Sequence, residues 1–173
     1  QIAPKINAVF RSENFSVLND YVFARTEQNV HFIREMVTSA WSESRKEIQK
    51  VADFIEVTVM QSFIVANLDT VEKEIQGIPR RTLQNYTGLM ANILSSRFGK
   101  PCLVFCSENS SDYKISLRDF LSRNYLEVFK LFSEANGHPS AFGIYLKKEN
   151  LSEFMYFLDL VDRGKYVSGV QNE

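Results

Sequence analysis

The chain has 173 residues and a mass of 20.0 kDa, enough for one domain with a substantial core or for a domain with a helical appendage. Hydrophobic residues make up 45% of it and charged residues 24%, with only 7 Gly and 4 Pro, which excludes a disordered chain and a collagen. The 20 Lys and Arg residues nearly balance the 21 Asp and Glu residues, so any site for a polyanion has to be local.

Targeting signals and cysteines point to the cytoplasm. The sequence has no run of 18 apolar residues and no signal-peptide pattern, so we expect no membrane partner. Cys102 and Cys106 lie four residues apart in an apolar run and are predicted to be reduced core residues. Because the first residue is Gln1 rather than Met, we expect the chain to be a piece of a longer protein.

The first third of the sequence predicts helices. Residues 14–57 contain neither Gly nor Pro. Ser12 or Asn14 can cap a short helix that runs to Phe23, and Thr26 can cap a longer helix that runs toward Phe54. Apolar residues at spacings of three and four define the buried face of these helices: Phe32, Ile33, Met36, Val37, Ala40, Trp41, Ile48, Val51, Ala52 and Ile55.

From residue 57 onward, strands alternate with helices. β-Branched and apolar runs predict strands at 62–67, 102–106, 112–118 and 144–147. Helices are predicted at 82–98, with Leu89, Ala91, Ile93 and Leu94 inward and Gly99 as the C-cap, at 120–134, and after Glu149. This order predicts an α/β domain with a mixed β-sheet flanked by helices, preceded by a helical connector.

Few residues suit catalysis. The two histidines, His31 and His138, form no metal-ligand pattern, and no nucleophile motif or phosphate loop is present. NGHPSAFG at 136–143 predicts a turn in which Gly137 allows close backbone approach and Pro139 starts a short helix whose free N–H groups face an anion beside His138. In KISLR, Ser116 and Arg118 share one face of a strand and are a candidate phosphate site.

Four segments in this order resemble the C-terminal half of RecJ-like single-stranded-DNA exonucleases of the DHH phosphoesterase superfamily. They are IAPKINAVFR, GLMANILSSRFGKPCLVF, KISLRD and NGHPSAFG. They resemble the family's APxINAxGR segment, its GxxAxxLxxxxGKP helix, its GSxRS-like strand and its GGHxxAAG turn. The resemblance covers residues 2 to about 157.

The resemblance implies a division of the chain and a set of binding residues. Residues 1–57 would be the end of the catalytic-domain seam and a helical connector, and residues 58–173 a DHH-associated domain that binds substrate. By their match to the motifs, Ser116, Arg118, Gly137 and His138 would contact a nucleic-acid strand, and Asn7, Arg11 and Asn136 would have supporting roles. Arg80 and Arg81 are further candidates for counter-charge.

The catalytic part that the resemblance implies is outside this sequence. The family's DHH carboxylates, which bind Mn²⁺ or Mg²⁺, would belong to an N-terminal DHH domain, so this segment alone is expected to hydrolyse nothing and to hold no metal. Its partners would be that domain and a single-stranded nucleic acid or short oligonucleotide.

Departures from the motifs keep two alternatives open. Asn136 stands for the first Gly of GGH and is expected to adopt a left-handed conformation, and Asp119 places a negative charge beside Arg118. Phe10 and Phe142 also replace smaller residues. The first alternative is the substrate-binding half of a nanoRNase or cyclic-dinucleotide phosphodiesterase, and the second is a catalytically silent scaffold relative.

Overall fold

The computed structural model describes residues 5–7, 9, 16, 19, 20, 23, 26–73, 78 and 80–164. The chain divides into two compact units, Gln1–Asp53 and Phe54–Glu173. Within the described ranges, no helix is long and apolar enough to cross a membrane.

The first unit is dominated by one long helix, α3 (Glu27–Phe54), which confirms the predicted second helix. Thr26 caps it, because its hydroxyl accepts a hydrogen bond from the Asn29 N–H at 3.2 Å. Ile33 and Val37 pack with Val9 as predicted, but Phe32 is 63% exposed. Met36 is exposed too, so the apolar periodicity overstates the width of the buried face. The predicted short helix before Phe23 lies largely outside the described residues.

The second unit is built on a six-stranded mixed sheet, which confirms the predicted α/β class. Its strands lie in the order β1-β2-β3-β4-β6-β5, and only β2 and β3 are parallel neighbours. The strands are β1 (Val57–Val59), β2 (Ile64–Asn67), β3 (Cys102–Ser107), β4 (Asp112–Arg118), β5 (Ala135–His138) and β6 (Ala141–Lys147).

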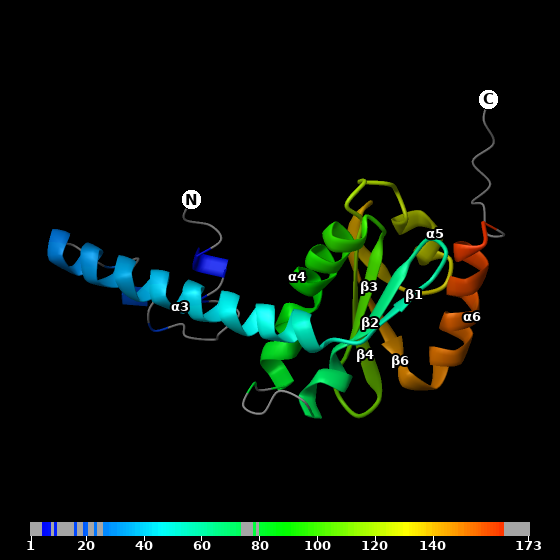
Figure 1. Ribbon diagram of the computed structural model, residues 1–173, viewed down its shortest axis with the longest axis horizontal. Helices are drawn as coiled ribbons and strands as arrows, with labels where there is room; N and C mark the ends of the chain where they lie inside the picture. Colours follow the sequence, from blue (N-terminus) through cyan, green and yellow to red (C-terminus); the bar gives the residue numbers. More distant parts are fainter. Residues whose placement is uncertain are drawn as a thin grey trace. The chain divides into compact units, whose positions relative to one another are not determined.

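Helices cover the two faces of this sheet, with α4 (Arg80–Phe98) on one side and α6 (Leu151–Asp162) on the other (Figure 1). Short helices connect the strands: η1 (Leu68–Lys73), α5 (Leu126–Lys130) and η2 (Lys148–Asn150). The sequence predicts α4 closely, including Gly99 just after it with a φ of 64°. Leu89 and Ile93, predicted inward, are only half-buried.

The main core lies between the sheet and the α5/α6 side. Alternate residues of β4 and β6, including Ile115, Leu117, Phe142 and Ile144, pack there against aromatic residues of the helices. Phe129 stands at the centre of this cluster, with ring centroids 5.5 Å from Phe142, 5.6 Å from Phe157 and 6.1 Å from Phe154. The opposite residues of β4 and β6 therefore face α4 or solvent.

The predicted helix over 120–134 is wrong for most of its length, because only Leu126–Lys130 are helical. Asp119 stops an earlier start by accepting hydrogen bonds from the N–H groups of Leu121 and Arg123, and Ser122 has a φ of 56°. The N–H groups of Tyr125 and Leu126 donate to the Pro139 oxygen instead of to a preceding helical turn. Tertiary contacts thus replace a helix that the apolar spacing favours.

The segment NGHPSAFG forms a β-hairpin, so the predicted helix start at Pro139 is wrong. Asn136 and His138 belong to β5, and β6 begins at Ala141, three residues earlier than predicted. Among the described non-glycine residues only Ser122 has a positive φ, so Asn136 does not adopt the expected left-handed conformation. Its backbone is extended because it pairs with Gly143 across the hairpin.

Candidate nucleic-acid interface

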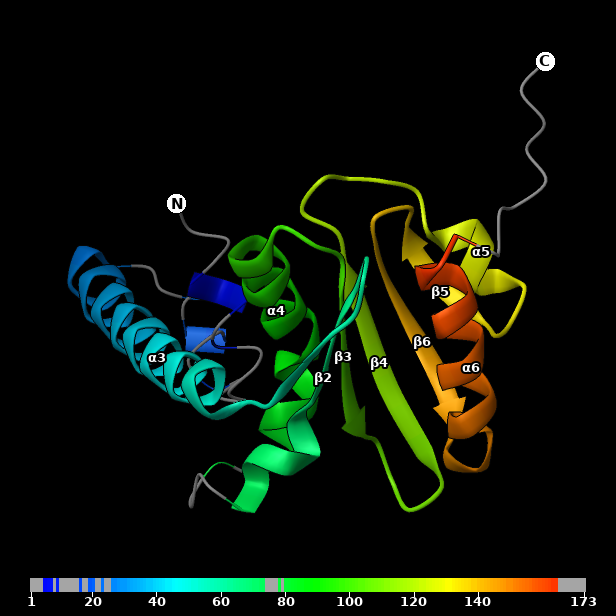
Figure 2. The same ribbon diagram turned by 45° about the vertical axis from the view of Figure 1, so that its right-hand side comes forward.

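The KISLR strand and the NGHPSAFG hairpin lie side by side through β6. Arg118 is paired with Ala141, and Ala141 is paired with His138, so these three residues form one row across β4, β6 and β5. Cross-strand partners in an antiparallel sheet project to the same face. The structure thus brings together the two predicted elements, which are some twenty residues apart in the sequence. Figure 2 shows β4 and β6 running alongside each other.

A second row lies two residues further along the strands. Ser116 is paired with Gly143, and Gly143 with Asn136. These residues share the face of Arg118 and His138, because the residues between them point into the core. Together the two rows contain four of the predicted contact and supporting residues.

Arg118 is half-buried and has no acidic partner among the described residues. Its Nη1 donates hydrogen bonds to the main-chain oxygens of Leu117 at 2.7 Å and Phe142 at 3.3 Å. Burial lowers the pKa of the guanidinium from its ordinary value, although the group remains charged at neutral pH. A partly desolvated cation neutralised only by carbonyl dipoles is suited to an anionic ligand.

Helix α4 forms the wall beside Arg118. A Cβ added to Gly88 would lie 2.8 Å from Arg118 Nη2 and 3.7 Å from Ser116 Oγ, so glycine makes room for the guanidinium. Ser116 is 6% exposed, and its hydroxyl donates to Thr87 Oγ at 3.0 Å. Ser116 is therefore attached to α4 behind Arg118 instead of projecting from the surface.

The hairpin requires Gly137. Its φ is 144°, and a Cβ at this position would meet the Ala141 oxygen at 2.7 Å and the Phe142 Cα at 2.8 Å. The close approach that the sequence predicts for this glycine is therefore made to the partner strand of the hairpin.

His138 is exposed at the end of β5, with its Nδ1 3.4 Å from the Ser140 hydroxyl. Asn136 is also exposed, whereas Ala141 and Gly143 between the outer strands are small. The surface between Arg118 and the β5 edge is consequently low, with polar side chains at its borders.

The negative charge expected next to Arg118 is used elsewhere. Asp119 is 7% exposed, and its carboxylate accepts hydrogen bonds from Arg123 Nε at 2.9 Å and Nη2 at 3.1 Å, and from the N–H groups of Leu121 and Arg123. Burial favours the neutral acid, but these hydrogen bonds outweigh it and hold the pKa of Asp119 below its usual range. Because Arg123 neutralises this carboxylate, it does not oppose an anion at Arg118.

The other predicted residues lie away from these rows. Arg80 is at the start of α4, with its Nη2 3.5 Å from Asp69 Oδ1, and the adjacent Arg81 is exposed. Gly88 follows Arg80 by about two helical turns, so the two arginines are not beside Arg118. Asn7 is an exposed helical residue of the first unit, and Arg11 lies outside the described residues.

Other candidate centres lack reactive groups. Burial raises the pKa values of the Cys102 and Cys106 thiols to about 12, so both are inert core residues at neutral pH, as predicted. In the part of the chain that the structure describes, no three acidic, histidine or cysteine residues are placed to hold a metal ion. The residues present do not fit the Mn²⁺ or Mg²⁺ that the resemblance implies for a catalytic domain.

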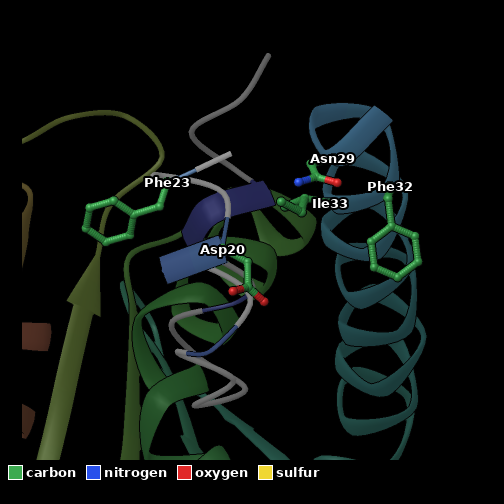
Figure 3. Close-up of a pocket in the computed structure, with 5 residues that line it drawn as sticks. All are labelled: Asp20, Phe23, Asn29, Phe32 and Ile33. Carbon is green, nitrogen blue, oxygen red and sulfur yellow. The ribbon is translucent and has the colours of Figure 1, made fainter. Parts of the chain in front are cut away.

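A surface pocket in the first unit is lined by Asp20, Phe23, Asn29, Phe32 and Ile33. Figure 3 shows the Phe23 and Phe32 rings pointing away from each other, and Asp20 is the one charged residue among the five. This arrangement offers no convergent set of groups for catalysis.

Sequence reasoning missed the part played by Gly88 and Thr87. A glycine inside a helix costs stability relative to alanine and often has a packing reason, so Gly88 carried a usable signal. Thr87 gave no signal, because only the fold places its hydroxyl beside Ser116.

Comparisons with known proteins show the fold. No family model and no curated protein matches the sequence. The structure of RecJ from Thermus thermophilus with Mn²⁺ matches at a TM-score of 0.64 and 13% identity, over 99% of this chain and 25% of that one. The same protein with Mg²⁺ gives 0.65 and 13%, over 96% and 25%. CDC45 from Entamoeba histolytica gives 0.50 and 9%, over 88% and 36%.

The chain spans about a quarter of the length of the RecJ structures that it matches. At 13% identity the likeness concerns the fold, and it extends over both the long helix and the sheet unit, because nearly the whole chain is covered. The chain therefore has the fold of a RecJ-like DHH-associated segment, as the motifs in its sequence predict.

Proposed function

We propose that this chain is the nucleic-acid-binding part of a RecJ-like, metal-dependent single-stranded-DNA exonuclease, a cytoplasmic DNA-repair hydrolase. Phosphodiester hydrolysis would belong to a separate N-terminal DHH domain with Mn²⁺ or Mg²⁺. The coverage of a quarter of the RecJ chain supports a missing domain, and the fold supports a nucleic-acid-processing relative.

The observation that carries the proposal is the environment of Arg118. Within the described residues its guanidinium has carbonyl partners but no carboxylate, and it stands in one row with exposed His138. A phosphate beside it would receive a charge-assisted hydrogen bond, which is stronger than a bond between neutral groups.

The other residues of the two rows have supporting roles in this proposal. Gly88 and Ser116 fix the position of the Arg118 side chain, and Gly137 shapes the hairpin that presents His138. The low surface at Ala141 and Gly143 gives a sugar-phosphate backbone access to both Arg118 and His138. Arg80, Arg81, Asn7 and Arg11 remain outside this set.

Fluorescence anisotropy of the chain with a labelled single-stranded oligonucleotide tests the proposal. Binding should weaken as salt rises, because phosphate contacts release counterions. Arg118→Ala should weaken it by about 1–3 kcal/mol, the cost of losing a charge-assisted contact. Arg118→Met, which retains bulk beside Gly88, should behave in the same way if charge is decisive.

Arg163→Ala is the matched control, since Arg163 is an arginine with a 58% exposed side chain that pairs with Asp159 at 2.9 Å after α6. It should leave affinity unchanged. If Arg118→Ala and Arg163→Ala bind as the unmodified chain does, Arg118 is not a phosphate ligand. Absence of salt-sensitive binding by the unmodified chain would favour the scaffold alternative.

A further inference from the structure

The polar face of the sheet continues beyond the two rows already described. Two residues past Ser116 on β4 is Lys114, which is paired with Tyr145 of β6. Both residues lie on the Arg118 face, because their neighbours Ile115, Ile144 and Leu146 are in the core on the other side. This Lys114–Tyr145 row is thus a third row of the same surface.

Tyr145 is exposed where a core residue would be covered. Its exposed fraction is 61%, and among the described residues neither Tyr145 nor Lys114 has a hydrogen-bond or ionic partner. An accessible aromatic ring beside an ammonium group is the combination that single-stranded nucleic acids use, with a base stacked on the ring and a phosphate near the cation.

The surface changes character after this row. The next pair along the strands is Asp112 with Lys147, and Lys147 Nζ is 3.9 Å from Glu149 Oε1. Two carboxylates next to one lysine disfavour a polyanion. The basic and aromatic part of the face therefore ends at Lys114 and Tyr145.

The separation of the two ends sets the length of the ligand. Arg118 and Lys114 are four residues apart on one strand, or about 14 Å at the rise of an antiparallel strand. A stacked strand advances by about 3.4 Å per nucleotide, so this span corresponds to about four steps. A dinucleotide, which has a single step, cannot reach from the Arg118–His138 row to Tyr145.

We infer that Tyr145, with Lys114, forms a second contact site for a base of a single-stranded nucleic acid bound at Arg118, and that this site favours strands longer than a dinucleotide. The inference rests on the proposed function, because it takes Arg118 as the first contact. It bears on the alternative of a phosphodiesterase for short substrates, which would have no use for a contact so far along the sheet.

The test compares the affinities of labelled dT2 and dT8 for the unmodified chain, Arg118→Ala, Tyr145→Ala and Tyr145→Phe. Tyr145→Ala should weaken dT8 binding roughly 5- to 150-fold, which corresponds to about 1–3 kcal/mol of base stacking. It should leave dT2 binding unchanged, and Tyr145→Phe should retain most of the dT8 affinity because the ring remains. Arg118→Ala should weaken the binding of both ligands.

Tyr156→Ala is the control, because Tyr156 is 65% exposed but belongs to α6 on the opposite side of the sheet. Equal dT8 affinity of Tyr145→Ala and Tyr156→Ala, with Arg118→Ala impaired, would overturn the second contact and leave the proposed function standing. Equal losses of dT2 and dT8 binding in Tyr145→Ala would overturn the length preference. If dT8 does not bind the unmodified chain at millimolar protein, both proposals fail.

Discussion

The guanidinium of Arg118 and the backbone of Gly88 are in direct apposition. An alanine at position 88 would place its Cβ 2.8 Å from Arg118 Nη2, inside van der Waals contact. The atom that would have to move is the far end of a flexible side chain, so the helix can accept the methyl group while the arginine cannot retain its position. Gly88 thus couples a helix to the proposed binding row.

Gly88→Ala should therefore separate stability from binding. Alanine in a helix interior is favoured over glycine by about 1 kcal/mol, so the free energy of unfolding should be unchanged or slightly higher. Affinity for a single-stranded oligonucleotide should fall, because the guanidinium is displaced from the Leu117 and Phe142 oxygens. Urea denaturation and anisotropy measure the two quantities. Ser96→Ala, on an exposed position of α4, should alter neither, and undiminished affinity in Gly88→Ala would contradict the coupling.

Gly137→Ala should destabilise the hairpin. Its φ of 144° is unfavourable for any residue with a side chain, and the strain costs about 1–3 kcal/mol before the contacts with the Ala141 and Phe142 backbone are added. Gly143→Ala is the matched control, because a Cβ there meets only the Ile115 oxygen, at an ordinary 3.7 Å. Thermal unfolding should show a clear loss in the first variant and little change in the second. Equal stabilities of the two variants would refute the assignment.

Local sequence patterns predicted the elements that form from local preferences. Strand β4 matches its predicted range of 112–118, and α4 ends at Phe98 before Gly99 as predicted. The failures occur where long-range hydrogen bonds decide the backbone. The Pro139 oxygen accepts the N–H groups of Tyr125 and Leu126, and β5 exists only because Ala135–His138 pair with β6.

The candidate site was predictable in its residue types and less so in its geometry. The alternation in KISLR places Ser116 and Arg118 on one face, and the register confirms this. The sequence does not show that Thr87 accepts the Ser116 hydroxyl, or that Arg123 neutralises Asp119. Tyr145 looks like an ordinary strand residue until its pairing with Lys114 is known.

Asp162→Ala should destabilise the sheet unit, because the Asp162 carboxylate joins the end of α6 to the loop before β2. It accepts hydrogen bonds from the N–H groups of Gln61 at 3.0 Å, Ser62 at 2.5 Å and Phe63 at 3.1 Å. Removing the acceptor leaves these donors unpaired in a partly or fully buried position, which should cost about 2–4 kcal/mol of unfolding free energy.

The control for this substitution is Asp159→Ala on the same helix. Asp159 makes an exposed ion pair with Arg163, and such pairs contribute at most about 1 kcal/mol. Denaturant titrations of both variants give the comparison. A loss in Asp162→Ala no larger than that in Asp159→Ala would show that the loop does not depend on this carboxylate.

Asp119 should make stability depend on pH in the acidic range. Its pKa in the folded chain is held below the ordinary value of about 3.9 that applies to the unfolded chain. A group whose folded-state pKa is depressed stabilises the protein above the unfolded pKa, and this contribution is lost as the pH falls through the folded pKa. The contribution of Asp119 should therefore be complete above about pH 5 and decline below about pH 4.

Asp119→Asn isolates this effect, because the amide does not titrate and provides only one acceptor oxygen. The variant should be less stable than the unmodified chain at pH 6, and the difference should shrink as the pH is lowered from 5 toward 2. Arg123→Ala should reproduce only part of the deficit at pH 6, since the N–H groups of Leu121 and residue 123 still donate to the carboxylate. Urea titrations at a series of pH values measure these differences. A deficit in Asp119→Asn that stays constant down to pH 2 would mean that the ionised carboxylate contributes nothing beyond its hydrogen-bonding shape.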